Sequence, residues 1–358
     1  MEQLYRVNDN LKCKKNYIYG NGIHALIVGE YYMGNQIHFE GFVAENGKGD
    51  ILGKPVISLD ELRKIPEANV MITESEWQEI YDKVYEYIEP EHIYINTTWI
   101  PKRFPCIACK NELTFSGNAL FVPFLVERMF RGEEKTTFMM HCPKCGIYYS
   151  YYRPTDEEIG RLYSGYREEV YQKQRQKYEE NYTKEFNKSL YEPIDGGRDR
   201  RDKIFNFIEE FVETDENMNI LDYGGDKGQF IPHQFLNAKK YVYEISGTDT
   251  LEDINLITDC NELYSYNWSI ILCNMVMEHV SDIEGCFSEL ISCMNDKSVL
   301  YIEVPIERYM ENREISFIHE HINFFREKTF YEMAKLFGVE VAKSETTDAI
   351  RCVIKKKS

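Results

Sequence analysis

The chain has 358 residues, 43% of them hydrophobic, and a formal net charge of −18 at pH 7. This length exceeds that of one typical domain, so two or three domains with their own cores are expected. The strongly acidic balance repels phosphate groups and argues against a nucleic-acid substrate.

The start of the chain, Met1–Arg6, lacks the basic and then apolar layout of a signal peptide. The longest apolar run, residues 119–126, is too short to cross a bilayer. The chain is large, and four of its ten cysteines fall in metal-type pairs, which indicates a reducing compartment rather than a secreted disulfide framework. We therefore predict a cytoplasmic protein without a membrane span.

Residues 1–100 alternate between strand-like and helical patterns, which favours a small α/β domain around a parallel sheet. Strands are expected at 17–19, 37–43, 70–72 and 92–95, and a helix at 75–88. A further helix begins after Ser58, because Glu61 three residues later completes a capping box.

The glycine turn Gly20–Ala25 follows the first of these strands and opens a helix. The order of strand, Gly-x-Gly-x-x-Ala and second strand resembles the Rossmann-like domain of bacterial sugar-modifying proteins, including certain sugar acetyltransferases. The resemblance implies that a nucleotide-sugar or its diphosphate binds at the helix N-terminus. A scaffold or dimerisation module without a ligand is the alternative.

The strongest single motif consists of two CxxC pairs, Cys106/Cys109 and Cys142/Cys145. Two thiolates on each of two turns complete a tetrahedron around Zn²⁺, and a site with four protein ligands is structural rather than catalytic. Gly146 suits the turn that follows the second pair. The long spacing between the pairs predicts an inserted hairpin at about 115–137. Disulfides or redox-active cysteines are the alternative.

Residues 148–191 are rich in tyrosine, and Thr155 with Glu158 predicts a capped helix that leads to Tyr163 and Tyr166. Cys-Pro-x-Cys-Gly, Arg-Pro-Thr and Leu-Tyr-x-x-Tyr in this order resemble the zinc-ribbon segment of a bacterial methyltransferase group. That group includes sugar C-methyltransferases and enzymes of cell-surface glycan clusters. The resemblance implies that the tyrosine helix covers a cofactor cleft, with Tyr163 or Tyr166 near the cofactor. Plain helix packing is the alternative for each tyrosine.

The C-terminal part opens with an amphipathic helix at 199–213. A strand ending on Asp222 then meets a glycine-rich turn, Gly224, Gly225 and Gly228, after which a helix is expected. Three further strands are predicted at 240–245, 254–257 and 268–273, and they bring Glu244, Asp259 and Asn274 to their ends. A fifth strand at 299–304, a helix at 326–337 and a hairpin at 338–355 complete the pattern.

These residues in this order resemble the class I S-adenosylmethionine (SAM) methyltransferases. The resemblance implies that Asp222 and the turn hold the amino-acid end of SAM and the nearby ribose, Glu244 the ribose hydroxyls and Asp259 the adenine, with Asn274 beside them. The turn departs from the family pattern at Asp226, a residue type that tolerates left-handed backbone. A dinucleotide-binding turn or a plain structural turn is the alternative.

A second motif, His319-Glu320-His321-Ile-Asn-Phe-Phe, follows the fifth strand. Open α/β sheets bind ligands at this edge, and a histidine beside a carboxylate is a usual general base. A metal site is the alternative, although three consecutive side chains point in different directions. The motif resembles the acceptor site of the sugar methyltransferases, which implies that His279, Glu320 and His321 face the substrate, with His321 as base. Phe317 and Ile318 stand where the C-methyltransferases have a tyrosine, which leaves O- or N-methylation open.

The predicted fold is α/β throughout, with a Rossmann-like domain (1–100), a zinc ribbon and tyrosine-rich segment (101–165), a helical linker (166–198) and a class I methyltransferase domain (199–358). The predicted function is SAM-dependent methylation of a sugar, nucleotide-sugar or glycan-type acceptor, with SAM and structural Zn²⁺ as cofactors. One rival is a methyltransferase for a protein, RNA or small-metabolite acceptor. The other is a non-catalytic scaffold.

Overall fold

The computed structural model describes residues 15–357 apart from 35, 75–76, 96–104, 112–113, 136, 167, 190–191, 196–197, 214–216, 247–248 and 308–314. The start of the chain, with the basic residues Lys12 and Lys14, and the linker glycines Gly196 and Gly197 lie outside the described residues. Within the described residues, no helix combines the length and apolar character that a membrane span requires.

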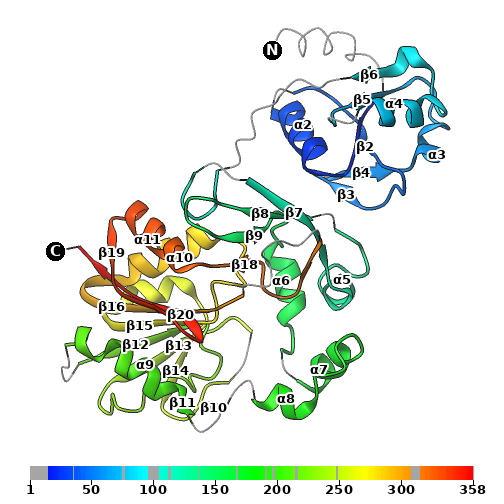
Figure 1. The fold of residues 1–358 in the computed structure, drawn as a ribbon. Helices are drawn as coiled ribbons and strands as arrows, with labels where there is room; N and C mark the ends of the chain where they lie inside the picture. Colours follow the sequence, from blue (N-terminus) through cyan, green and yellow to red (C-terminus); the bar gives the residue numbers. More distant parts are fainter. Residues whose placement is uncertain are drawn as a thin grey trace.

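The N-terminal part is a six-stranded sheet in the order β3-β4-β2-β1-β5-β6. Its strands are β1 (Lys15–Tyr19), β2 (Gly41–Val43), β3 (Asp50–Ile51), β4 (Lys54–Ile57), β5 (Ala68–Ile72) and β6 (Ile93–Ile95). Its helices are α2 (Ile23–Gly34), α3 (Leu59–Leu62), α4 (Trp77–Tyr85) and the short η1 (Pro90–His92). All pairs except β3–β4 are parallel, and Ser58 and Glu61 form the predicted capping box. The predicted parallel α/β arrangement is confirmed (Figure 1).

A second, five-stranded sheet has the order β17-β7-β8-β9-β18. Its middle strands are β7 (Thr114–Phe121), β8 (Thr137–His141) and β9 (Tyr148–Ser150), with α5 (Pro123–Arg128) between β7 and β8. The predicted inserted hairpin is therefore present, with a helix in its connection. Both edge strands, β17 (Ile315–Ile318) and β18 (Asn323–Phe324), come from the far end of the chain. One short C-terminal segment thus closes both sides of this sheet.

Short helices join this sheet to the C-terminal part: α6 (Asp156–Tyr163), α7 (Glu169–Gln176) and α8 (Lys184–Ser189). Thr155 and Glu158 form the predicted capping box of α6. A two-stranded ribbon, β10 (Ile194–Asp195) and β11 (Arg198–Asp199), then leads into α9 (Arg200–Ile208) and η2 (Glu209–Phe211). The sequence predicted one helix and a linker where α7 and α8 form two separate helices.

The C-terminal sheet has seven strands in the order β14-β13-β12-β15-β16-β20-β19. They are β12 (Asn219–Tyr223), β13 (Lys239–Tyr243), β14 (Ile254–Ile257), β15 (Trp268–Asn274), β16 (Met294–Pro305), β19 (Val339–Thr346) and β20 (Ala349–Lys356), with η3 (Cys260–Ser265) before β15. All neighbours are parallel except the β16–β20 and β19–β20 pairs. The predicted Rossmann-like methyltransferase sheet with an antiparallel hairpin is confirmed.

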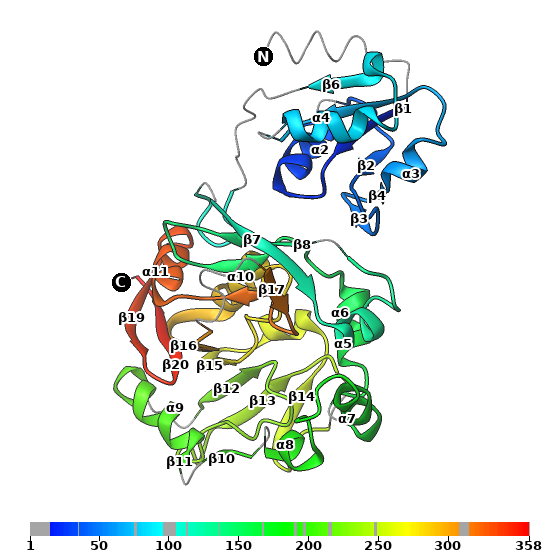
Figure 2. The same ribbon diagram turned by 45° about the vertical axis from the view of Figure 1, so that its right-hand side comes forward.

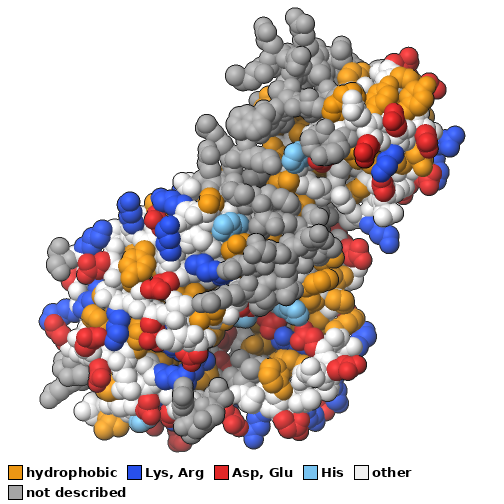
Figure 3. All heavy atoms as spheres, viewed as in Figure 1, with side chains coloured by type: hydrophobic (Ala, Val, Ile, Leu, Met, Phe, Trp, Pro, Cys, Tyr) orange, Lys and Arg blue, Asp and Glu red, His pale blue; other side chains and the backbone are white. Residues whose placement is uncertain are grey.

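Helices cover this sheet from two sides, as the two ribbon views agree (Figures 1 and 2). On one side, α10 (Ile283–Cys293) and α11 (Glu327–Leu336) contribute Phe287 and Phe330 to a core with Ile271 and Ile302. On the other side, α9 packs Ile204 and other side chains against a core of the same strands. On the face seen in Figure 3, acidic and basic side chains are interspersed over the described C-terminal residues rather than gathered by sign.

The helix expected after the glycine turn does not form, because residues 224–238 run as turns between β12 and β13. Pro232 explains the difference, since proline lacks an N–H donor and restricts the preceding residue to extended backbone. Ile231 and Phe235 instead bury against the sheet as an irregular segment. This prediction was wrong, and the glycine turn is not capped by a helix N-terminus.

Candidate active site

Two polar side chains are buried beneath the glycine turn, at the C-terminal ends of neighbouring strands. Asp222 of β12 is fully buried, and Asn274 at the end of β15 donates from Nδ2 to its Oδ1 over 3.4 Å. Asp222 Oδ2 and Asn274 Oδ1 are buried and find no hydrogen-bond partner among the described residues. Because buried polar atoms are nearly always paired, these two oxygens indicate a ligand at this point.

Burial raises the pKa of Asp222 to about 7, and the hydrogen bond from Asn274 and the charge of Arg200 offset that rise only in part. Arg200 in α9 ion-pairs with Glu303 of β16 at 2.7 Å and lies over the ring of Phe230 at 4.5 Å. A cation therefore stands near the buried carboxyl group, which the sequence did not suggest.

The turn over Asp222 requires unusual backbone. Gly224, Asp226 and Gly228 have φ values of 67°, 53° and 78°, all in the left-handed region. Gly228 N–H donates to the Gly225 carbonyl over 2.8 Å, and a Cβ on Gly225 would overlap the Asp222 carboxyl. Asp226 adopts the left-handed conformation that its residue type tolerates, so the departure at this position leaves the turn intact.

Two more acids stand at the ends of the next strands. Glu244, directly after β13, accepts from Asp226 N–H at 3.2 Å and from Ile245 and Ser246 N–H at 2.9 Å. Asp259, after β14, is exposed and accepts from Asn261 N–H at 2.9 Å as the cap of η3. Since β12, β13 and β14 are adjacent and parallel, the three acids line one edge of the sheet.

The motif 319–321 divides between different neighbours. Glu320 forms a bidentate ion pair with Arg175 of α7, at 2.8 and 3.0 Å. Burial alone would raise the pKa of Glu320, but the charges of Arg175, His321 and His279 together outweigh it and lower the pKa to about 2. His319 lies 3.6 Å from Glu179 and is 43% exposed. Only His321 of the three turns toward the segment after β15.

His321 meets Glu278 and His279 there. The His279 and His321 rings lie 4.6 Å apart and nearly perpendicular, and His279 Nε2 lies 3.8 Å from Glu278 Oε1. Burial raises the pKa of Glu278 to about 7. Burial lowers that of His321, but the Glu307 hydrogen bond and the charge of Glu278 outweigh this and raise the pKa to about 9. We call Glu278, His279 and His321 the imidazole–carboxylate cluster.

The sequence analysis named the two histidines of this cluster as site residues but did not name Glu278. The one sequence feature that could have indicated Glu278 is its position directly before His279. Glu307 accepts from His321 Nδ1 over 2.9 Å, and nothing in its sequence context predicted that contact. Tyr163 of α6 is 2.9 Å from His279 Nδ1 and packs edge-on against Tyr166 at 5.1 Å. Tyr163 therefore contacts the cluster and Tyr166 packs against Tyr163, while contact of either tyrosine with the cofactor remains a prediction.

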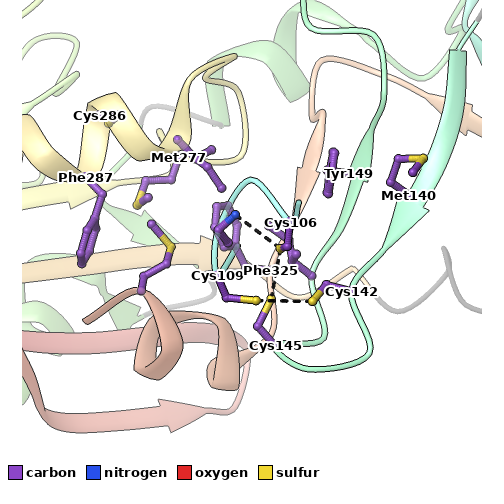
Figure 4. Close-up of a cluster of buried hydrophobic side chains, with 14 of the residues drawn as sticks. Cys106, Cys109, Met140, Cys142, Cys145, Tyr149, Met277, Cys286, Phe287 and Phe325 are labelled. Carbon is purple, nitrogen blue, oxygen red and sulfur yellow. Dashed lines mark hydrogen bonds between the residues drawn. The ribbon is translucent and has the colours of Figure 1, made fainter. Parts of the chain in front are cut away.

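The four motif cysteines converge on one buried point next to the C-terminal core (Figure 4). The sulfurs of Cys106 and Cys145 are 3.7 Å apart, and those of Cys109 and Cys142 are 3.5 Å apart. A disulfide needs about 2.05 Å, whereas ligands at about 2.3 Å from a tetrahedral Zn²⁺ stand about 3.8 Å apart. Gly146, at φ 80°, forms the turn after the second pair, as predicted. The geometry fits a metal ion and excludes disulfides here.

The N-terminal glycine turn is separate from the sites described above. Its residue Asn21 lines a cavity of about 800 Å³ between the first and second sheets. Asn21 and Lys48 line it from one side, and Phe121 and Lys135 from the other. Glu127 and Glu134 also line it, so the charges of the lining cancel and do not single out a phosphate. Ligand binding by this domain therefore stays a prediction.

Residues 197–344 match the sequence family described as "Methyltransferase domain". No curated protein sequence matches the chain.

Solved structures with similar folds include a SAM-dependent methyltransferase from Clostridium acetobutylicum, at 12% identity and TM-score 0.34, covering 44% of this chain and 91% of that one. The glycopeptide N-methyltransferase MtfA is 9% identical, with TM-score 0.35 and coverage of 46% and 93%. CalO1, a methyltransferase of calicheamicin biosynthesis with bound SAH, is 7% identical, with TM-score 0.35 and coverage of 51% and 60%. Likenesses this weak say nothing about what this chain binds.

Proposed function

We infer that this chain, whose residues 197–344 match a methyltransferase domain, uses SAM to methylate a sugar, nucleotide-sugar or other glycan-type acceptor. The observation that carries the SAM site is the pair of buried, unpartnered oxygens of Asp222 and Asn274 beneath the glycine turn. The sugar class rests on the resemblance of the His319–Phe325 motif to the acceptor site of sugar methyltransferases.

SAM supplies an electrophilic methyl group on a sulfonium. Asp222 and the backbone of Gly224, Gly225 and Gly228 would hold its amino-acid end and nearby ribose, since this part of the turn admits no side chain. Glu244 would accept from the ribose hydroxyls with the lone pairs that its backbone donors leave free. Asp259, exposed at the next strand end, would accept from the adenine amino group.

The imidazole–carboxylate cluster would form the acceptor end of the same edge. As the acceptor oxygen or nitrogen bonds to the methyl carbon, the carbon–sulfur bond breaks and its electron pair stays on sulfur. The proton of the acceptor passes to Glu278, whose charge the protonated His321 balances, and His279, oriented by Tyr163, aligns the acceptor. Glu320 acts through Arg175 and is a positioning residue rather than a base.

The four cysteines would hold a structural Zn²⁺, which supports the second sheet and through it the segment 315–324. Four thiolates leave the ion no open position for substrate. The Thr329 hydroxyl at the start of α11 donates to the Cys145 carbonyl over 3.0 Å, so this site is tied directly to the C-terminal domain.

The test combines two measurements on the full chain. Calorimetry should show SAM binding that Asp222→Asn weakens, and radiolabelled SAM should transfer its methyl group to a member of a nucleotide-sugar panel. His321→Ala should keep SAM binding and lose turnover, whereas unchanged turnover would remove His321 from the mechanism.

Each rival has its own outcome. Transfer to proteins or small amines alone would favour the alternative acceptor class, and transfer to RNA would do the same for a nucleic acid. Absence of SAM affinity at high protein concentration would favour a scaffold that keeps the fold without the reaction. The scaffold alternative is supported by the irregular segment 224–238, which stands where a helix was expected after the glycine turn.

A further inference from the structure

The imidazole–carboxylate cluster has the composition and shape of a metal site. One oxygen of Glu278 and one ring nitrogen each of His279 and His321 all lie within 4.8 Å of one another. The residues come from two segments, one after β15 and one between β17 and β18. We propose that this cluster binds a divalent transition-metal ion, which then ligates the hydroxyl groups of the acceptor. The role toward the acceptor rests on the proposed function, while the binding of the ion does not.

The donor set suits such an ion. Two imidazoles and one carboxylate on one face leave the other coordination positions open, an arrangement found in catalytic zinc and non-haem iron sites. Metal–ligand bonds of about 2.1 Å place neighbouring ligand atoms about 3 Å apart. The 3.8 Å between His279 Nε2 and Glu278 Oε1 therefore closes by less than about 1 Å, which side-chain rotation supplies.

The second nitrogen of each ring is already engaged in the way that metal-binding histidines require. His321 Nδ1 lies 2.9 Å from Glu307 Oε1, and His279 Nδ1 lies 3.2 Å from the Glu320 carbonyl oxygen. The Glu307 carboxylate accepts, so His321 Nδ1 donates the proton in its bond, while the Tyr163 hydroxyl, 2.9 Å from His279 Nδ1, is a second partner that holds the His279 ring. The partners on Nδ1 fix the orientation of both rings, and a metal ion would take His321 through Nε2 in place of the proton on that atom.

Glu278 provides an independent observation. Its side chain is only 1% exposed, and Oε2 finds no hydrogen-bond partner among the described residues. A buried carboxylate with an unsatisfied oxygen is costly unless a cation or donor meets it. A metal ion at the cluster would satisfy it without any change of fold.

The backbone holds the two ligand segments together in advance. The Glu278 carbonyl accepts from the N–H groups of Ile322 and Asn323 at 2.9 and 3.1 Å. The Asn323 side chain, fully buried, donates to the carbonyls of Met277 and Val280 at 2.8 Å each. The cluster therefore does not depend on a mobile loop, and binding of an ion orders little additional chain.

The ion would take part in the reaction as a Lewis acid. Adjacent hydroxyls of a sugar can fill two of its open positions, and ligation lowers the pKa of the reacting hydroxyl. Its proton then passes to the free oxygen of Glu278, while the oxygen bonds to the methyl carbon and the sulfur keeps the electron pair of the broken bond. This arrangement favours O-methylation of a vicinal diol over methylation of carbon.

The experiment measures the ion directly, without SAM or acceptor. Full-length protein with its cysteine site filled by zinc is titrated with Mn²⁺, and free Mn²⁺ is followed by electron paramagnetic resonance. Wild type should bind about one equivalent, since Mn²⁺ prefers oxygen and nitrogen ligands and leaves thiolate sites alone. His321→Ala and Glu278→Gln should abolish binding, and Glu307→Gln should weaken it by about 10–100-fold, as loss of a partner on the second nitrogen does.

His319→Ala is the matched control, because it removes a histidine two positions away that lies against Glu179 instead. This variant should bind Mn²⁺ as wild type does. The proposal is overturned if wild type binds no Mn²⁺, if His321→Ala binds it equally well, or if His319→Ala loses it to the same extent. Circular dichroism and zinc content establish that each variant is folded. SAM affinity, measured separately, distinguishes failure of this proposal from failure of the methyltransferase site.

Discussion

Arg175 and Glu320 join two distant parts of the chain through a bidentate ion pair, with both side chains at least 85% buried. Arg175 also lies over the ring of Tyr182 at 4.2 Å, and its Nε is 2.9 Å from Glu179. The pair ties α7 to the turn that carries His321, so α7 supports the proposed acceptor end of the site.

Arg175→Met should destabilise the protein by about 3–5 kcal/mol, because it leaves a buried carboxylate without its partner. The loss should appear as a lower urea midpoint together with a large loss of turnover. The double variant Arg175→Met/Glu320→Gln should recover part of the stability, since no charge then remains unpaired. Equal stabilities of the single and double variants would contradict this account.

SAM binding should depend on pH through Asp222. Its pKa of about 7 in the free protein means that the carboxyl is mostly protonated below that pH. A carboxylate accepts hydrogen bonds from SAM better than a carboxylic acid does, so binding favours the ionised form and releases a proton. Affinity should therefore be full above pH 7 and fall by up to about tenfold per pH unit below it. Calorimetry in buffers of different ionisation enthalpy measures the released proton, and Asp222→Asn should remove this pH dependence.

Gly225→Ala should weaken SAM binding and lower stability, because its Cβ would overlap the Asp222 carboxyl. We expect a cost of about 1–3 kcal/mol, as in other overpacked sites. Gly160→Ala is the matched control: this glycine lies inside α6 with open space where a Cβ would stand. It should be neutral or stabilising by up to about 1 kcal/mol. Thermal unfolding with and without SAM compares the two, and a harmless Gly225→Ala would show that the turn relaxes.

Cys145→Ser should remove the zinc ion that we propose the four cysteines hold. Metal analysis should fall from about one zinc per chain to a small fraction, and the melting temperature should fall with it, because structural zinc contributes directly to folding. Cys286→Ser is the control, since this cysteine is also buried but lies in α10 outside the four-cysteine cluster. A zinc content unaffected by Cys145→Ser would remove zinc from the site.

The positions of the acids at the strand ends could be predicted from the sequence. Parallel strands of one sheet bring their C-terminal ends to a common edge, and this does not depend on the structure of the loops between them. The helix after the glycine turn could not be excluded from periodicity, since Ile231 and Phe235 have helical spacing and only Pro232 argues against it. The local sequence pattern favours a helix there, but the segment instead packs against the sheet as turns.

The contacts of the motif 319–321, in contrast, could not be predicted from the sequence. Three consecutive polar residues carry no information about which partner each will face, and those partners, Arg175, Glu179 and Glu278, lie at least 43 positions away along the chain (321 − 278 = 43). The expectation that the side chains of His319, Glu320 and His321 point in different directions agrees with the geometry. The three-residue cluster that does converge combines members of two motifs, which only the fold could bring together.

The edge strands β17 and β18 have a consequence for how this protein can be divided. A fragment cut at residue 197, where the match to the methyltransferase family begins, would keep both strands but lose the three they flank. The backbone N–H and C=O groups of β17 and β18 would then lack their hydrogen-bond partners in the sheet, and unpaired strands promote aggregation. His321, which we propose takes part in the reaction, lies between these two strands, so its position depends on the sheet that carries the cysteines. The second sheet and the C-terminal sheet are therefore not separate modules, and expression of either one alone would leave the second sheet incomplete.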